Sequence, residues 1–117
     1  MSLTLRTARC EFSLAIAKLI LFAMSQGYEI ALAEGMDRKT HRDPTTDHMI
    51  GSLHEIGLAQ DLDLYKDGVY LMTTEDHATL GAWWLDYGKA CGLPLAWGGN
   101  FEKKDGNHYS LAWQGRK

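Results

Sequence analysis

Two potential metal ligands stand seven residues apart in the segment 52–65, which reads SLHEIGLAQDLDLY. His54 offers an imidazole nitrogen and Asp61 a carboxylate oxygen, and both groups bind zinc in proteins. Gly57 lies between them and can supply a turn, because glycine adopts backbone conformations that other residues avoid. The same segment is also compatible with a pair of strands that carries solvated polar residues. Spacing alone does not decide between the two interpretations, since a metal centre needs a third ligand from elsewhere in the chain.

A third ligand is available near the C-terminus, where His108 stands in the sequence DGNHYS. Together with His54 and Asp61 it gives three protein ligands, which leave a fourth position open as catalytic zinc requires, whereas a structural zinc fills all four. Asp105 lies three residues before His108. A carboxylate just outside the metal shell can take a proton from a metal-bound water and later pass it to a leaving amine. The four residues therefore favour metal-assisted hydrolysis.

Each of these residues also has an ordinary interpretation. A single histidine in a soluble protein is usually at the surface or hydrogen-bonded, Asp61 alone fits an exposed strand position, and Asp105 alone fits a turn. Asp63 shares a strand face with Asp61 and is the rival ligand. The alternative for the whole set is a small α+β domain whose polar strand residues are merely solvated. Three further histidines have no partner at a suitable spacing and keep the ordinary interpretation: His41, His48 and His77.

A helix is predicted over Leu5–Gln26, and Gly27 stands where a helix-ending glycine is expected. Apolar residues recur there at helical spacing and form one face: Phe12, Ile16, Leu19, Ile20 and Ala23. The apolar run 13–25 within it resembles a signal peptide. It contains Lys18, has no small-residue cleavage site and is too short to span a bilayer, so we interpret it as a core helix without an export signal.

Alternating apolar residues predict short strands after this helix. The segments 28–34 and 58–65 both alternate, and the KDG sequence at 66–68 predicts a turn into a return strand, VYLM, at 69–72. The segment 35–50 is polar and irregular and is predicted to be a long loop. Within 58–65 one face carries Leu58, Leu62 and Leu64, and the other carries Ala59, Asp61, Asp63 and Tyr65.

The second predicted helix covers Thr73–Cys91, with Thr73 or Thr74 as its cap and Gly92 at its end. A glycine-rich turn, WGGNF, and a final strand, HYSLAW, follow it. This order predicts an α+β fold, a small and largely antiparallel sheet packed against two main helices. We expect a single domain over residues 1–117. The apolar stripe of the second helix is formed by Leu80, Trp83, Trp84, Tyr87 and Cys91.

Composition excludes several classes of function. The 117 residues carry a net charge of −3 with a pI of about 5.9, which gives no basic footprint for nucleic acid and no polybasic patch for membranes. The two cysteines, Cys10 and Cys91, are too few and too far apart for a disulfide framework or a zinc knuckle. We expect both to be reduced and partly buried.

The potential ligands lie in a pattern that resembles the M15 family of zinc peptidases. The resemblance covers residues 12–113, and its first motif, S-x-H-x-x-G-x-A-x-D, is specific, whereas its second, an acid three residues before a zinc histidine, is weak alone. The segments LDLYKDGVYL and WGGNF are similar to the phage-borne branch of the family. The fixed positions of the two motifs are Ser52, His54, Gly57, Ala59 and Asp61, then Asp105 and His108.

The resemblance implies one zinc ion per chain, with His54, Asp61 and His108 as its ligands and Asp105 as the catalytic base. The family's base is often Glu, so the shorter Asp105 must reach further. Ser52 is implied to support the site by hydrogen bonding. The family also uses an arginine before the serine motif, to polarise the substrate carbonyl or bind a substrate carboxylate. Arg38 is the nearest match and Arg42 the alternative, although the usual aromatic–arginine pair is replaced by GMDRKT.

The implied function is hydrolysis of a peptidoglycan stem-peptide bond by a zinc metallopeptidase of the endolysin type. The bond between L-Ala and D-Glu is favoured, and a D-Ala-D-Ala carboxypeptidase is the alternative. From another class, the chain could be a non-catalytic zinc-binding module of phage assembly or wall binding. We expect a monomer that binds the stem peptide, neither binds nucleic acid nor inserts into membranes, is made in the cytoplasm, and acts at the cell wall or periplasm after holin-type release.

Overall fold

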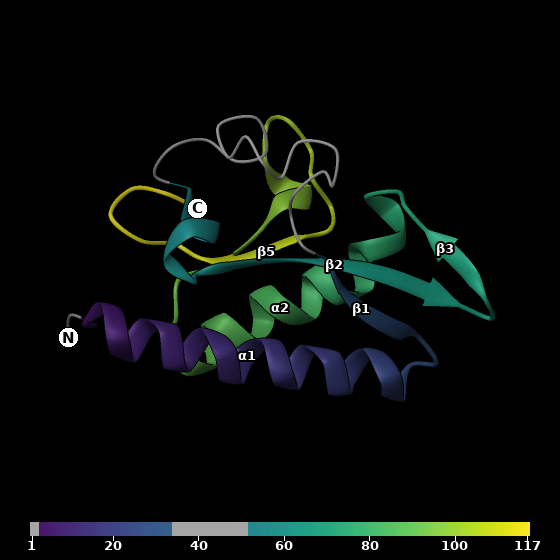
Figure 1. The fold of residues 1–117 in the computed structure, drawn as a ribbon, viewed down its shortest axis with the longest axis horizontal. Coiled ribbons are helices and arrows are strands. Elements are labelled where there is room, and N and C mark those ends of the chain that lie inside the picture. Colours follow the sequence, from purple (N-terminus) through teal and green to yellow (C-terminus); the bar gives the residue numbers. More distant parts are fainter. Residues whose placement is uncertain (1–2, 34–51) are drawn as a thin grey trace.

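Two helices cover one face of a small antiparallel sheet, which confirms the predicted α+β class (Figure 1). The computed structural model describes residues 3–33 and 52–117. Three short 3-10 helices, labelled η, lie between the main elements. The order is α1 (Leu5–Ser25), β1 (Glu29–Ala33), η1 (Leu53–Ile56), β2 (Ala59–Lys66), β3 (Val69–Leu71), η2 (Glu75–His77), α2 (Ala78–Cys91), β4 (Leu95–Trp97), η3 (Gly98–Asn100) and β5 (His108–Leu111).

Strand β2 is the centre of the sheet. The strand order is β1-β2-β5-β4, and β3 pairs with the C-terminal part of β2; every pairing is antiparallel. The β2–β3 turn has two residues, Asp67 and Gly68, both with positive φ, of 52° and 77°. Two such residues match the twist of paired strands, which explains why the KDG sequence forms a hairpin here. β2 can therefore pair with three strands along its length.

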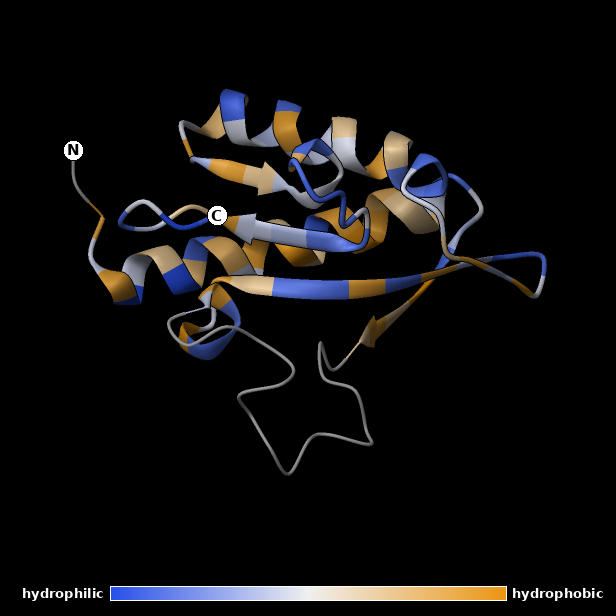
Figure 2. Ribbon diagram, turned by 90° about the horizontal axis from the view of Figure 1, so that it is seen from above, coloured by the Kyte–Doolittle hydropathy of each residue, from blue (hydrophilic) through white to orange (hydrophobic). Residues whose placement is uncertain are grey.

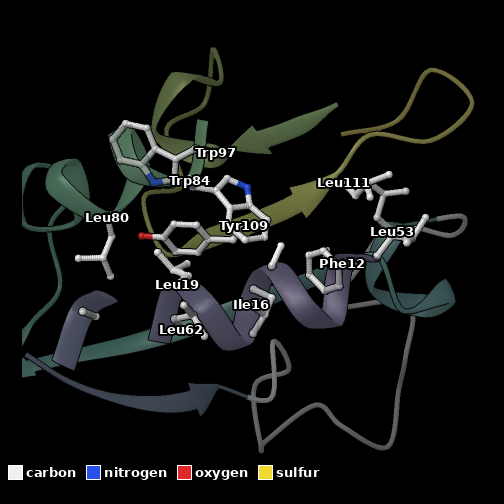
Figure 3. Packing of buried hydrophobic residues seen from close by; sticks show 14 of the residues in the cluster. Phe12, Ile16, Leu19, Leu53, Leu62, Leu80, Trp84, Trp97, Tyr109 and Leu111 are labelled. Atoms are coloured by element: carbon white, nitrogen blue, oxygen red, sulfur yellow. The ribbon is translucent and has the colours of Figure 1, made fainter. Parts of the chain in front are cut away.

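Alternation along β2 separates the two faces of the sheet. Leu58, Leu62 and Leu64 are fully buried, as predicted, and lie on the face that the helices cover. In Figure 3, Leu62 lies beside Leu19 and Ile16 of α1, and Figure 2 shows hydrophilic and hydrophobic segments succeeding one another along β2. Burial of each leucine stabilises the fold by roughly 1.5–3 kcal/mol. The other face of β2 is left for polar residues.

The second helix starts later than its sequence suggests. The predicted segment Thr73–Cys91 begins with η2, and the α-helical part starts at Ala78. Thr73 is nevertheless confirmed as a cap: its Oγ1 accepts from the Asp76 amide at 3.1 Å, and Asp76 Oδ2 accepts from the Thr73 amide at 3.2 Å. This reciprocal pair satisfies two backbone donors at the start of the segment.

One strand was missed and one expectation was wrong. Strand β4 (Leu95–Trp97) was not predicted, because three residues are too few to show an alternating pattern, and only its last residue lies in the predicted turn. The predicted strand at 28–34 is confirmed as β1, although its apolar residue Leu32 is 63% exposed in this edge strand, which has only β2 beside it. Cys10 and Cys91 are free thiols, as expected, but both are exposed, and Cys91 is the last residue of α2.

Part of the sequence analysis concerns residues outside the described ranges. The predicted loop 35–50 lies there, and so do Arg38, Arg42, His41 and His48. The run 13–25 is part of α1 and packs into the core, as predicted. Among the described residues, no helix combines the length and the hydropathy needed to cross a bilayer.

A buried polar pair links η2 to the sheet. His77 is 2% exposed, and its Nδ1 lies 2.8 Å from the hydroxyl oxygen of Tyr109, which is fully buried. Burial lowers the pKa of His77 below its ordinary value of 6.5, although the charges of Asp76 and Asp63 oppose this shift. Burial also raises the pKa of Tyr109. Both side chains are therefore neutral at pH 7 and share a hydrogen bond in the core.

Replacement of His77 by leucine should lower the free energy of unfolding at pH 7.5 by about 1–3 kcal/mol, because the buried Tyr109 hydroxyl loses its partner. In the wild type, the unfolded chain binds a proton at His77 more readily than the folded chain does. The stability that His77 contributes is thus complete above pH 6.5 and is lost as the pH falls through the folded-state pKa.

Urea unfolding at pH 7.5 and pH 5 measures both effects. Wild type should lose more stability between these two pH values than His77→Leu does. An equal loss in the two proteins would show that His77 does not titrate in this way.

Candidate metal centre

His54 is positioned by the short helix η1. Ser52 caps it, and Ser52 Oγ accepts a hydrogen bond from the His54 amide at 3.2 Å. Gly57 ends it with a φ of 76°, a left-handed conformation that favours glycine. The Leu58 amide then donates to the Leu53 carbonyl at 2.9 Å, and Leu53 is buried. The segment is thus a helical turn followed by a strand, and His54 does not lie on a strand.

Asp61 and His108 are brought together by strand register. Asp61 is the third residue of β2, His108 is the first residue of β5, and the two are direct partners in the antiparallel pairing. Side chains of such partners leave the same face of the sheet with Cβ atoms about 4.5–5.5 Å apart. The buried Leu62 and Leu64 stand at alternate positions of β2, so the ligands leave the face opposite to the helices.

The ligand atoms of the three residues surround one point. Asp61 Oδ1 lies 3.4 Å from His54 Nε2 and 3.5 Å from His108 Nδ1, and all three atoms lie within 4.8 Å of one another. Both distances exceed those of ordinary hydrogen bonds. They match the separation of about 3.3–3.5 Å between ligand atoms that sit 2.0–2.2 Å from a tetrahedral zinc. The donor set therefore fits a divalent metal better than it fits a hydrogen-bonded triad.

The Asp61 carboxyl is ionised in this group of residues. Asp61 Oδ1 is buried and has no hydrogen-bond partner among the described residues, and the same holds for Nε2 of His108. Burial opposes ionisation of Asp61, but the two imidazoles that face it outweigh burial and place the pKa of this carboxyl well below its ordinary value. A buried carboxylate oxygen without a hydrogen-bond partner is costly unless a cation lies beside it. A metal ion would fill that role.

The turn that carries Asp105 and His108 is fixed by backbone contacts. The Asp105 amide donates to the Gly98 carbonyl at 2.9 Å, and the His108 amide donates to the Asp105 carbonyl at 3.0 Å. A Cβ atom on Gly98 would lie 2.0 Å from the Asp105 carbonyl oxygen, so only glycine permits this approach. Asp105 is exposed, at the edge of the turn that leads into β5.

Two aromatic residues position the turn, and the sequence analysis gave neither a role. Trp97 Nε1 donates to the Gly106 carbonyl at 2.7 Å, which ties the end of β4 to the turn. The Phe101 ring packs beside the His108 imidazole, with 5.3 Å between ring centroids. Both residues lie in the WGGNF segment, whose aromatic and glycine content was the available signal. Their contacts depend on tertiary structure, so spacing alone did not reveal them.

Of the other predicted site residues, Asp63 lies two residues beyond Asp61 on the same face and is outside the three-ligand group. Its Oδ1 instead accepts from the Tyr70 hydroxyl at 3.3 Å. The predicted substrate contact, Arg38 or Arg42, lies outside the described residues. Metal binding by His54, Asp61 and His108, and proton transfer by Asp105, remain predictions.

Comparison with solved structures finds proteins of similar fold. The crystal structure of Serratia marcescens L-Ala D-Glu endopeptidase ChiX matches this chain with a TM-score of 0.61 and 23% sequence identity. The match covers 82% of this chain and 77% of the other. No family model matches the sequence, and no curated protein matches it either. At this identity the likeness shows a shared fold, and the site must carry the argument for function.

Zinc titrations of two variants can distinguish a ligand aspartate, Asp61, from its neighbour on the same face, Asp63. We expect Asp61→Asn to weaken zinc binding by more than about 100-fold, because loss of an outer-shell partner alone costs 10–100-fold. Asp63→Asn makes the same chemical change two residues further along β2, on the same face, and should retain the wild-type affinity for zinc. Competition titration with a chromophoric chelator measures both. Equal losses in the two variants would show that Asp61 is not a specific ligand.

Proposed function

We propose that this chain is a metal-dependent peptidase that cleaves a stem-peptide bond of peptidoglycan, of the M15 type, with residues 1–117 forming one peptidase domain. The observation that carries the proposal is the convergence of His54 Nε2 and His108 Nδ1 on the buried Oδ1 of Asp61. The likeness in fold to an L-Ala D-Glu endopeptidase also supports it.

The three ligands and the base have separate tasks in this proposal. His54, Asp61 and His108 hold one zinc ion, which when bound supplies Lewis acidity for the scissile carbonyl and lowers the pKa of a water molecule. Asp61 contributes a negative charge, because a carboxylate binds a metal in its deprotonated form. Asp105 accepts a proton from the attacking water and returns it to the departing amine. Its exposed position lets it exchange protons with solvent between turnovers.

The bond between L-Ala and D-Glu is the proposed target. The solved structure with the same fold is named for that activity, and the chain's motif resembles the phage endopeptidases. An enzyme of this kind acts at the cell wall or in the periplasm. The bond is identified by the new chain ends that appear on digestion, since cleavage there releases the amino group of D-Glu, whereas a carboxypeptidase releases free D-Ala.

Purified sacculi provide the direct test. The protein, with about one zinc per chain, should lower the turbidity of a sacculus suspension. A chelator should stop this, and added zinc should restore it. Mass spectrometry of the released material should show new D-Glu amino termini. Release of free D-Ala would identify the enzyme as a D-Ala-D-Ala carboxypeptidase instead. Bound zinc without any cleavage product would contradict the proposal that the chain is a peptidase.

Asp105→Ala should lower kcat by at least about 100-fold, the lower range for loss of a general acid–base, while zinc affinity stays within a few fold of wild type. The matched control is Glu102→Ala. Glu102 is an exposed acid in the same β4–β5 connection and should keep near-normal turnover. The measurement is the initial rate on a soluble stem peptide, beside a zinc titration. Near-normal turnover by Asp105→Ala would disprove its assignment as the base.

A further inference from the structure

An aromatic and anionic surface lies on the same face of the sheet as the three proposed ligands, farther along β2. Asp63 and Tyr65 follow Asp61 at alternate positions and therefore share its face. Strand register adds Glu29 of β1 and Tyr70 of β3, each of which is the direct partner of Tyr65. We refer to Glu29, Asp63, Tyr65 and Tyr70 as the aromatic–acidic patch.

Contacts within the patch place the two rings beside a carboxylate. The ring centroids of Tyr65 and Tyr70 are 5.3 Å apart, with a 40° angle between the planes. The Tyr70 hydroxyl donates to Asp63 Oδ1 at 3.3 Å. Tyr70 is 45% exposed and Glu29 is exposed, so solvent and solutes reach the patch. A tyrosine pair at the surface is poorly explained by core packing.

The three strands provide no cation to this face. Lys66 is the single lysine or arginine in β1, β2 and β3. Its side chain leaves the opposite face of the sheet from that of Tyr65, and its Nζ lies 4.8 Å from the centroid of the Tyr28 ring. Asp63 and Glu29 thus carry two negative charges beside two aromatic faces. Such a combination attracts a cation through both ion pairing and the ring quadrupoles.

Distance along the strand relates the patch to the scissile bond. At about 3.3 Å per residue, Tyr65 lies about 13 Å from Asp61 along β2. Two extended residues together with one long side chain span a similar distance. A peptide whose scissile bond lies at the three ligands can therefore place a side-chain terminus at the patch. Neutral sugar rings also stack on tyrosines, and their hydroxyls donate hydrogen bonds to carboxylates, but they gain no ion pair there.

We propose that the aromatic–acidic patch binds a primary ammonium group on a substrate side chain. In a peptidoglycan stem peptide, the diamino acid that follows D-Glu carries such a group. This assignment rests on the proposed function, because it takes the substrate to be a stem peptide that lies along β2. It makes the patch a determinant of specificity, separate from the residues that perform the cleavage.

Two synthetic stem peptides test the assignment. They differ only at the third residue, which is lysine in one and norleucine in the other, so that the ammonium group alone is removed. Wild type should cleave the lysine peptide with a kcat/KM roughly five- to tenfold higher. Asp63→Asn should bring this ratio close to one. Asp86→Asn, the same change at an exposed position on α2, should preserve it.

Zinc content and thermal unfolding of each variant show that the comparison concerns intact, metal-loaded protein. The ratio should also fall at high salt, because exposed charges are screened there. Equal cleavage of both peptides by wild type would overturn the assignment and leave the proposed function in place. The same ratio in Asp63→Asn as in Asp86→Asn would overturn it too.

If wild type cleaves neither peptide, the proposed function fails. Binding of the two peptides then decides whether the patch is an ammonium site. The two peptides are titrated into chelator-treated protein while the tyrosine ring resonances are followed by NMR. Tighter binding of the lysine peptide that is lost in Asp63→Asn supports an ammonium site. Equal binding of the two peptides, or no response of the tyrosine rings, overturns it.

Discussion

The pairing of Asp61 with His108 across β2 and β5 is the constraint on which the site depends. A slip of one residue in this register would turn one of the two side chains toward the helices. Three leucines in and just before β2 oppose such a slip, because Leu58, Leu62 and Leu64 are fully buried and would have to enter solvent. The apolar core thus specifies the geometry of the ligands, although it lies on the opposite face of the sheet from them.

The proposed ligands differ in how far their positions follow from local sequence. His54 and Asp61 are related by one helical turn, one left-handed glycine and three strand residues, so their spacing in the motif nearly determines their spacing in the structure. His108 depends on a strand pairing between distant segments, and its sequence neighbourhood shows only a turn followed by alternation. It was identified through the combination of residue types and the resemblance to M15 peptidases.

What the sequence did not reveal depends on tertiary contact. β4 is too short for a periodic signal, and the roles of Trp97 and Phe101 exist only because the β4–β5 connection folds back onto itself. Leu32 followed the alternating pattern and is still exposed, since a pattern does not indicate which strand forms an edge. The two helices, their glycine ends and the β2–β3 hairpin were predictable, because each rests on the conformational preferences of a few adjacent residues.

The separation of the ligands along the chain also has a kinetic meaning. Contacts between distant segments form late in folding, because the entropy of closing a long loop must be overcome first. Two ligands lie before α2 and the third lies after it, so the complete donor set arises only once nearly the whole chain has folded. An ion bound there would join β2 to β5 as a cross-link does, and would stabilise the folded state by an amount that rises with the logarithm of the free metal concentration above Kd. Metal supply would then set the lifetime of the folded chain as well as its activity.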